Sequence, residues 1–212
     1  MQSYKIHFSD KRFVLSFISG GLLLTISLFM QFLASNYATR IASGPVTDII
    51  LSNTRVYDVD RIFVWGAVVL LFIGVGVCMK SINYMPFAMK SVALFTLIRS
   101  VFVSLTHISP FPTSVLISSE FFSNTIFNGI FNGYDLFFSG HTGLPFLLAL
   151  MFWDNKKLRF VFLGFSAVFA VVVLLGHLHY SIDVLAAYFI TFTIFQICKF
   201  VFKKDWELFL KK

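Results

Sequence analysis

The stretch from Gly176 to Thr191 holds the residues best suited to chemistry, because two histidines there run straight into an apolar segment. His179 and Asp183 are four residues apart, so on a helix they lie on one face about one turn from each other. A carboxylate placed there can hold one imidazole nitrogen and leave the other free to attack an electrophile. The pair therefore predicts a histidine nucleophile oriented by an aspartate.

A second group of residues, Ser139-Gly140-His141-Thr142-Gly143, precedes another apolar stretch. Ser139 can cap a helix that begins there, and Gly140 allows a ligand to approach the backbone. Exposed amides at a helix N-terminus favour an anion. His141 is therefore expected to stand beside a bound phosphate, although Pro145 predicts a kink or a late start of the helix.

Arg99 lies near the middle of an apolar stretch, Phe87 to Ser109. A guanidinium at that depth of a membrane costs ~2.5 kcal/mol or more, so it should face the protein interior or a polar cavity. One interpretation is a phosphate clamp, because the guanidinium fork matches phosphate oxygens. The other is a structural ion pair with an acidic residue, for which the candidates are Asp183, Glu120 and Asp135.

These residues must be positioned by membrane-spanning helices. The chain has 58% hydrophobic and 13% charged residues and a mean hydropathy of +0.83, which excludes an ordinary soluble domain of 212 residues. Crossing the hydrocarbon core of a bilayer takes about 20 apolar residues. Six spans are predicted, at about Phe13 to Ser35, Ile62 to Met79, Phe87 to Ser109, Leu136 to Trp153, Phe160 to Leu175 and Ser181 to Phe202.

The positions of the basic residues predict the orientation. With a cytoplasmic N-terminus, 13 of the 17 Lys and Arg residues fall on the cytoplasmic side, as the positive-inside rule requires. They are Lys5, Lys11, Arg12, Lys80, Lys90, Lys156, Lys157, Arg159, Lys199, Lys203, Lys204, Lys211 and Lys212. We therefore expect one all-α membrane domain over residues 1–212, a six-helix bundle with both termini cytoplasmic. His141, His179 and Asp183 then converge on the outer face.

The remaining features favour plain structural roles. The +7 net charge follows from this topology, so nucleic acid is not an expected partner. Cys78 and Cys198 lie in apolar spans and indicate neither a disulfide nor a metal site. The loop from Asn36 to Arg61 has balanced charge, which is typical of a solvated outer loop or an interfacial helix. It could instead cover the entrance to a site.

The two motifs resemble those of the sphingomyelin synthase branch of the type 2 phosphatidic acid phosphatase superfamily. The matching residues are Ser139-Gly140-His141-Thr142 and His179-Tyr180-Ser181-Ile182-Asp183-Val184, with Tyr188 and Thr191. Asp135 fits that branch's Asp-x-x-x-Ser-Gly-His-Thr pattern, and Arg99, Thr106 and Pro110 fit an upstream motif more weakly. The resemblance covers about Arg99 to Thr191.

The resemblance implies six spans, an exoplasmic site and metal-independent chemistry through a phosphohistidine. It assigns catalysis to His141, His179 and Asp183, and substrate or phosphate binding to Arg99, Asp135, Ser139, Gly140 and Tyr180, without metal or cofactor. The substrate would be a membrane phospholipid, with ceramide, diacylglycerol or water as acceptor. A bacterial plasma membrane is the expected location.

Three functions remain open. The first is a lipid phosphotransferase or phosphodiesterase that moves a phospho-headgroup. The second is a water-using lipid phosphate or pyrophosphate phosphatase, weakened because Arg99 is followed by Ser100 where those enzymes have Arg-Pro. The third is a transporter or ion pathway with a relay through Arg99, His141 and Asp183. A metal site built from His177, His179 and Asp183 is a further variant.

Overall fold

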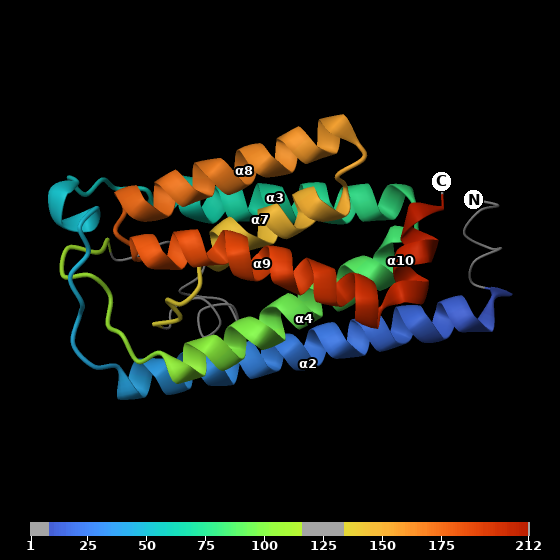
Figure 1. The fold of residues 1–212 in the computed structure, drawn as a ribbon, viewed down its shortest axis with the longest axis horizontal. Coiled ribbons are helices and arrows are strands. Elements are labelled where there is room, and N and C mark those ends of the chain that lie inside the picture. Colours follow the sequence, from blue (N-terminus) through green and yellow to red (C-terminus); the bar gives the residue numbers. More distant parts are fainter. Residues whose placement is uncertain (1–8, 116–133, 212) are drawn as a thin grey trace.

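Figure 1 shows the computed structural model, in which residues 9–115 and 134–211 are described. Long helices run up and down along one axis, and all regular secondary structure in the described residues is helical. The helices are α2 (Lys11–Ile41), α3 (Asp60–Lys80), α4 (Tyr84–Leu105), α7 (Gly140–Met151), α8 (Lys156–Leu175), α9 (Ser181–Val201) and α10 (Lys203–Leu210), with the 3-10 turn η1 (Leu51–Asn53).

Five of these helices, α2, α3, α4, α8 and α9, are long and apolar enough to cross a membrane. The remaining expected span, Leu136 to Trp153, corresponds to α7, which has only 12 residues and is therefore about 18 Å long. Residues 134–139 before it are not helical. A multi-pass membrane fold is thus confirmed, whereas the count of six full spans is not.

Helix boundaries follow local signals. Asp10, Ser139 and Asn155 are the N-caps of α2, α7 and α8, and each side chain accepts a hydrogen bond from a backbone N–H two or three residues ahead. Such caps satisfy donors that have no partner inside the helix. Pro145 lies inside α7 and does not end it.

The expected ends of two helices were wrong, and one helix was not expected. The helix α4 ends at Leu105, so residues 106–109 are not helical. The helix α2 continues to Ile41, so residues 36–41, placed in the loop by the sequence, are helical. The chain after the last span forms α10, which was not expected. Its Trp206 and Phe209 rings pack against Phe87 of α4, so aromatic burial holds this segment on the bundle.

The packing positions the two motif-bearing helices next to each other. The helix α2 lies along α4, and α7 packs against both α8 and α9. The largest hydrophobic core is rich in aromatic residues, with Phe87, Phe138, Phe162 and Phe169 almost fully buried. The core therefore holds the N-termini of α7 and α9 close together.

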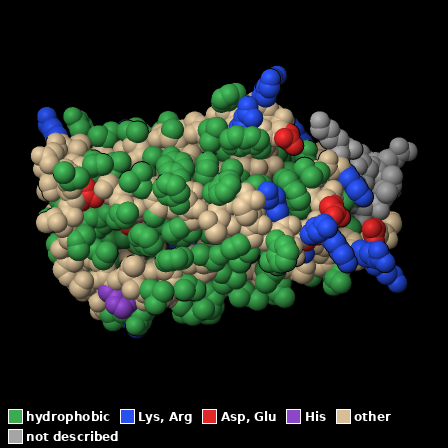
Figure 2. All heavy atoms as spheres, in the orientation of Figure 1, with side chains coloured by type: hydrophobic (Ala, Val, Ile, Leu, Met, Phe, Trp, Pro, Cys, Tyr) green, Lys and Arg blue, Asp and Glu red, His purple; other side chains and the backbone are tan. Residues whose placement is uncertain are grey.

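The start of α2 and the end of α10 lie at the same end of the molecule (Figure 1). Lys and Arg side chains gather at that end, while hydrophobic side chains cover much of the length beyond it (Figure 2). Lys90, near that end, is buried: it is 8% exposed and forms an ion pair of 2.7 Å with Asp205. The cytoplasmic placement of this end stays a prediction.

Candidate active site

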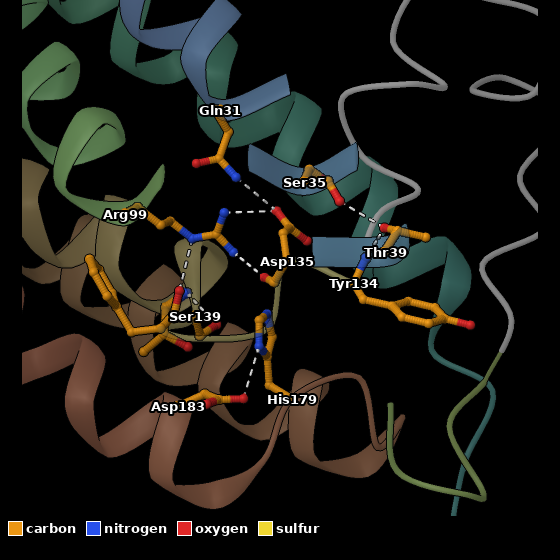
Figure 3. A network of polar contacts seen from close by, with 11 residues as sticks. Gln31, Ser35, Thr39, Arg99, Tyr134, Asp135, Ser139, His179 and Asp183 are labelled. Carbon is orange, nitrogen blue, oxygen red and sulfur yellow. Dashed lines mark hydrogen bonds and ion pairs between the residues drawn. The ribbon is translucent and has the colours of Figure 1, made fainter. Parts of the chain in front are cut away.

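His179 and Asp183 meet at the start of α9. The Nδ1 atom of His179 lies 3.5 Å from Oδ2 of Asp183, and both residues are more than nine-tenths buried. Because α9 begins at Ser181, the contact spans the helix N-terminus instead of lying along one helical face. Asp183 Oδ2 also accepts the backbone N–H of Tyr180 at 2.9 Å, so its carboxylate is held beside the histidine, as Figure 3 shows.

The first turn of α7 is attached directly to this unit. The backbone N–H of Ser139 donates to the carbonyl of Asp183 at 3.1 Å. The Ser139 hydroxyl oxygen accepts from the Thr142 N–H at 3.4 Å, which places Ser139 as the N-cap of α7. The two motifs, about 40 residues apart in the chain, are therefore joined by one backbone hydrogen bond.

Arg99 holds the segment that leads into α7. Its Nε donates to the carbonyl of Phe138 at 2.8 Å, its Nη1 to Oδ2 of Asp135 at 2.7 Å, and its Nη2 to the carbonyl of Asp135 at 2.6 Å. These three contacts use three of the five N–H donors of a guanidinium. Of the three acidic partners considered, Asp135 is the one found; Glu120 lies outside the described residues.

Gly140 allows the Arg99 guanidinium to lie close to the first residue of α7. A Cβ atom at Gly140 would lie 3.2 Å from Nε and 3.5 Å from Cζ of Arg99. A larger residue would push the guanidinium away, so glycine permits the close approach. The cation thus lies against the backbone where an anion was expected.

Gln31 of α2 completes this polar group and was missed by the sequence reasoning. Its Nε2 donates to Oδ2 of Asp135 at 3.3 Å, and its buried Oε1 has no hydrogen-bond partner among the described residues. Ser27, Gln31 and Ser35 are all buried and are spaced by four residues along α2. That polar face inside an apolar span was the available signal.

His141 lies between aromatic rings. Its ring centroid is 3.8 Å from that of Phe63 on α3 and 5.5 Å from that of Phe169 on α8. It is close enough to His179 and Arg99 to interact with both electrostatically. That His141 acts together with the His179–Asp183 pair stays a prediction.

The Tyr180 hydroxyl is hydrogen-bonded within the protein, which is not what we expect of a group that binds substrate. It is 2% exposed, and its hydroxyl donates to the Ser109 carbonyl at 2.8 Å and accepts the Val46 N–H at 3.2 Å. Burial raises the pKa of this phenol, so the hydroxyl stays protonated and able to donate. A contact of Tyr180 with substrate stays a prediction.

Two further histidines, His107 and His177, make hydrogen-bond contacts outside the His179–Asp183 pair. His177 has a positive φ of 52°, and its Nδ1 lies 2.6 Å from the Thr113 hydroxyl. His107 contacts the Ser104 carbonyl through Nε2 at 2.8 Å. Residues 9–115 and 134–211 contain no group of three His, Cys, Asp or Glu side chains that could hold a metal ion, so the His177–His179–Asp183 metal variant has no support from their positions.

Asp48 also belongs to the site's surroundings and was not singled out from the sequence. Its carboxylate accepts backbone N–H groups from Ile50, Leu51 and Ser181. Burial works against ionisation, but these hydrogen bonds more than offset it and lower the pKa of Asp48. The carboxylate is therefore charged at neutral pH and faces the first residue of α9.

A match to a protein-family model supports the superfamily that the two histidine motifs resemble. Residues 134–200, about a third of the chain, match the family model described as PAP2 superfamily C-terminal. The matched region contains both histidine motifs and Asp135 but not Arg99. It supports the type 2 phosphatidic acid phosphatase superfamily. No curated protein and no solved structure matches the chain.

Proposed function

We propose that this chain is an integral membrane lipid phosphotransferase or phosphodiesterase that acts on phospholipid headgroups through a phosphohistidine, as sphingomyelin synthases do. One observation carries the proposal: the Asp183 carboxylate, fixed by the Tyr180 N–H, lies 3.5 Å from His179 Nδ1. His179 Nδ1 makes no hydrogen bond to the described residues, and contacts between catalytic groups often tighten only when substrate binds. The orienting carboxylate on Nδ1 leaves Nε2 of His179 as the nucleophile.

The first half of the reaction transfers the phospho group to the enzyme. Nε2 of His179 attacks phosphorus, an N–P bond forms, and the P–O bond to the leaving alcohol breaks. His141 protonates the departing alkoxide, and Asp183 stabilises the positive charge on the substituted imidazole. A diacylglycerol would leave if the donor were a glycerophospholipid.

The second half returns the enzyme to its starting state. A lipid hydroxyl, such as that of ceramide or diacylglycerol, or a water molecule gives its proton to His141 and attacks the phosphohistidine. The N–P bond breaks and His179 is regenerated. The acceptor decides between transfer and hydrolysis, while the histidine chemistry is the same for both.

Arg99 and the start of α7 would bind the phosphate charge. Two of the guanidinium N–H donors are not used by the contacts to Asp135 and Phe138. The N-terminus of α7 adds the amides near Gly140 and a favourable dipole. Donors that face the charge of the transition state often supply the largest part of catalysis.

The bundle argues for a lipid substrate. Five helices are long and apolar enough to cross a membrane, so lipid tails could stay in the bilayer during reaction. We place the site on the exoplasmic or periplasmic side of the plasma membrane, because it lies at the end opposite the Lys-rich end.

A water-using lipid phosphate or pyrophosphate phosphatase is the second candidate. It is favoured by the matched superfamily, whose name refers to phosphatase activity. A transporter or ion pathway has less support, because Arg99 is held by Asp135 and Phe138 and does not form part of a relay to Asp183.

The deciding experiment uses purified protein in detergent with phospholipids labelled at phosphorus, with and without ceramide or diacylglycerol, and with a chelator in parallel. Wild type, His179→Ala and the matched control His107→Ala are compared. We expect label on the acceptor lipid or on a released phospho-headgroup, an acid-labile labelled protein intermediate, and loss of both only in His179→Ala.

Other outcomes select the alternatives. Inorganic phosphate released only from lipid monophosphates or pyrophosphates would establish the phosphatase. Activity lost on chelation would contradict metal-independent chemistry. A wild type as inert as His179→Ala on every lipid would reject the enzyme and favour transport.

A further inference from the structure

The loop between α2 and α3, residues 42–59, is attached to the candidate active site through one carboxylate. Asp48 is 7% exposed. Its Oδ2 accepts the Ser181 N–H at 2.7 Å, and its Oδ1 accepts the N–H groups of Ile50 at 2.8 Å and Leu51 at 3.1 Å. The same side chain therefore shapes its own loop and caps the first residue of α9.

Further contacts fix this loop on both sides of Asp48. The Val46 N–H donates to the Tyr180 hydroxyl, and the Tyr57 N–H donates to the Leu175 carbonyl at 2.9 Å. Val59 lies so close to Gly176 that a Cβ there would be 2.4 Å from a Val59 methyl carbon. The loop is thus anchored at these points to the turn that carries His179, while most of its residues are exposed, as the sequence predicted for a solvated loop.

Two carboxylates share the N-terminus of α9. The first N–H groups of a helix have no acceptor inside the helix, and here Asp48 takes the one of Ser181 while Asp183 takes the one of Tyr180. Asp183 uses the same oxygen to face His179. Without Asp48 the Ser181 N–H would lack its acceptor, and Asp183, two residues further along in the same first turn, would be a carboxylate available to take its place by moving away from the histidine.

We infer that Asp48 is a positioning residue for the His179–Asp183 pair: by capping Ser181, it leaves Asp183 free to orient His179. The inference rests on the proposed function only for its effect on turnover. The other charged or titratable groups around the pair are Tyr180 just before α9, Arg99 on α4, Asp135 before α7 and His141 on α7. None of them contacts the Ser181 N–H.

The test compares Asp48→Ala with Asp58→Ala, a matched loss of a carboxylate from the same loop. Asp58 accepts the Asp60 N–H at the start of α3 and does not touch α9. Since small displacements of catalytic groups can cost up to about 100-fold, we expect Asp48→Ala to lower kcat by about 10- to 100-fold with little change in KM. Asp58→Ala should behave as wild type.

A change in the NMR signal of the His179 ring separates positioning from general destabilisation. The chemical shift of the ring depends on the carboxylate beside it, so the His179 signal should move in Asp48→Ala and stay in place in Asp58→Ala. The protein is histidine-labelled, and the signal is assigned through His179→Gln. A defect in folding alone would reduce the active fraction without moving this signal.

Asp48→Asn provides a second variant if Asp48→Ala does not fold. It keeps one acceptor oxygen, so an intermediate loss and an intermediate shift are expected. Unchanged kcat and an unchanged NMR signal of the His179 ring in both Asp48 variants would overturn the inference while leaving the proposed function intact. An inert wild type whose His179 signal still shifts on Asp48→Asn would reject the proposed function and support the positioning role.

Discussion

The Arg99 guanidinium holds the residues that lead into α7. The sequence left open a phosphate clamp or an ion pair, and the guanidinium is found on Asp135 and on the carbonyl of Phe138. These contacts hold the segment that enters α7 without using every donor. Arg99 can therefore fix the α7 terminus and still reach a phosphate.

Arg99→Lys should be a severe change even though it keeps the charge. A lysine ammonium cannot reproduce the planar fork that reaches three acceptors at once, so both the α7 terminus and the phosphate contact suffer. We expect kcat/KM to fall by about 10²- to 10³-fold, the range seen when one donor to a transition-state oxyanion is removed. The measurement is the steady-state rate on the best lipid substrate.

Arg40→Lys is the matched control, because Arg40 is an exposed arginine in the last turn of α2. Its rate should equal that of wild type. If Arg99→Lys also retained wild-type kcat/KM, neither role of the guanidinium fork would stand.

The sequence predicted the contact between site residues that lie close together in the chain. His179 and Asp183 do meet, because four residues bring them together across the start of a helix. Gln31 and Asp48 were not assigned, since each meets its partner only through the tertiary fold: Asp135 in one case and Ser181 in the other. Tyr180 carried no sign that its hydroxyl would be used by Ser109.

Among the elements, α7 depends on a glycine for its place beside α9. A Cβ at Gly143 would lie 2.8 Å from the Thr191 hydroxyl oxygen and 2.9 Å from two ring carbons of Phe95. Thr191 and Phe95 are themselves buried, so neither can move freely. The close approach of α7 to α4 and α9 therefore requires a residue without a side chain.

Gly143→Ala should destabilise the protein, because overpacking a filled core costs about 1–3 kcal/mol. Gly164→Ala is the control: it lies inside α8 with nothing within 4 Å of its added Cβ, and the higher helix propensity of alanine should stabilise by up to about 1 kcal/mol. Thermal unfolding in detergent measures both. Equal melting temperatures for the two variants would contradict this packing.

The sequence predicted most helices but not their lengths. Apolar periodicity and length identify a span well, which is why α3, α8 and α9 begin and end close to the expected residues. The start of α7 depends on the contacts of residues 135–138 with Arg99, and α10 depends on aromatic partners in α4. Neither dependence is visible in a local window.

Over the whole molecule, the end opposite the active site is held by a buried ionic group. Lys90 of α4 donates to Asp205 of α10 and to the Ser16 hydroxyl of α2, each at 2.7 Å. The Ser16 hydroxyl in turn donates to Asp205. Three helices from the beginning, middle and end of the chain are joined there.

Lys90→Met should be more damaging than removal of both charges. Loss of one partner leaves the Asp205 carboxylate buried without its cation, which costs about 3–5 kcal/mol. The double variant Lys90→Met with Asp205→Leu removes the buried charge and should recover most of the stability. A double-mutant cycle based on thermal unfolding measures this, and additive losses would show that the pair does not couple the helices.

Composition alone predicted a multi-pass helical membrane protein, because burial of so many apolar residues in a soluble domain of this size is not possible. The packing of α2 against α4 and of α7 against α8 and α9 could not be predicted from the sequence, because every span is apolar on much of its surface. Which faces meet depends on small and polar residues at single positions.

The depth of Arg99 has a consequence for the lipid. Arg99 lies six residues before Leu105, the end of α4, which is about 9 Å along the helix axis. If the end of α4 lies at the membrane surface, a phosphate that reaches the guanidinium in the proposed reaction lies below the level of the lipid headgroups. The protein would then draw the lipid phosphate toward the membrane interior, and the thickness of the surrounding membrane would help to set the distance that each substrate phosphate moves along the membrane normal.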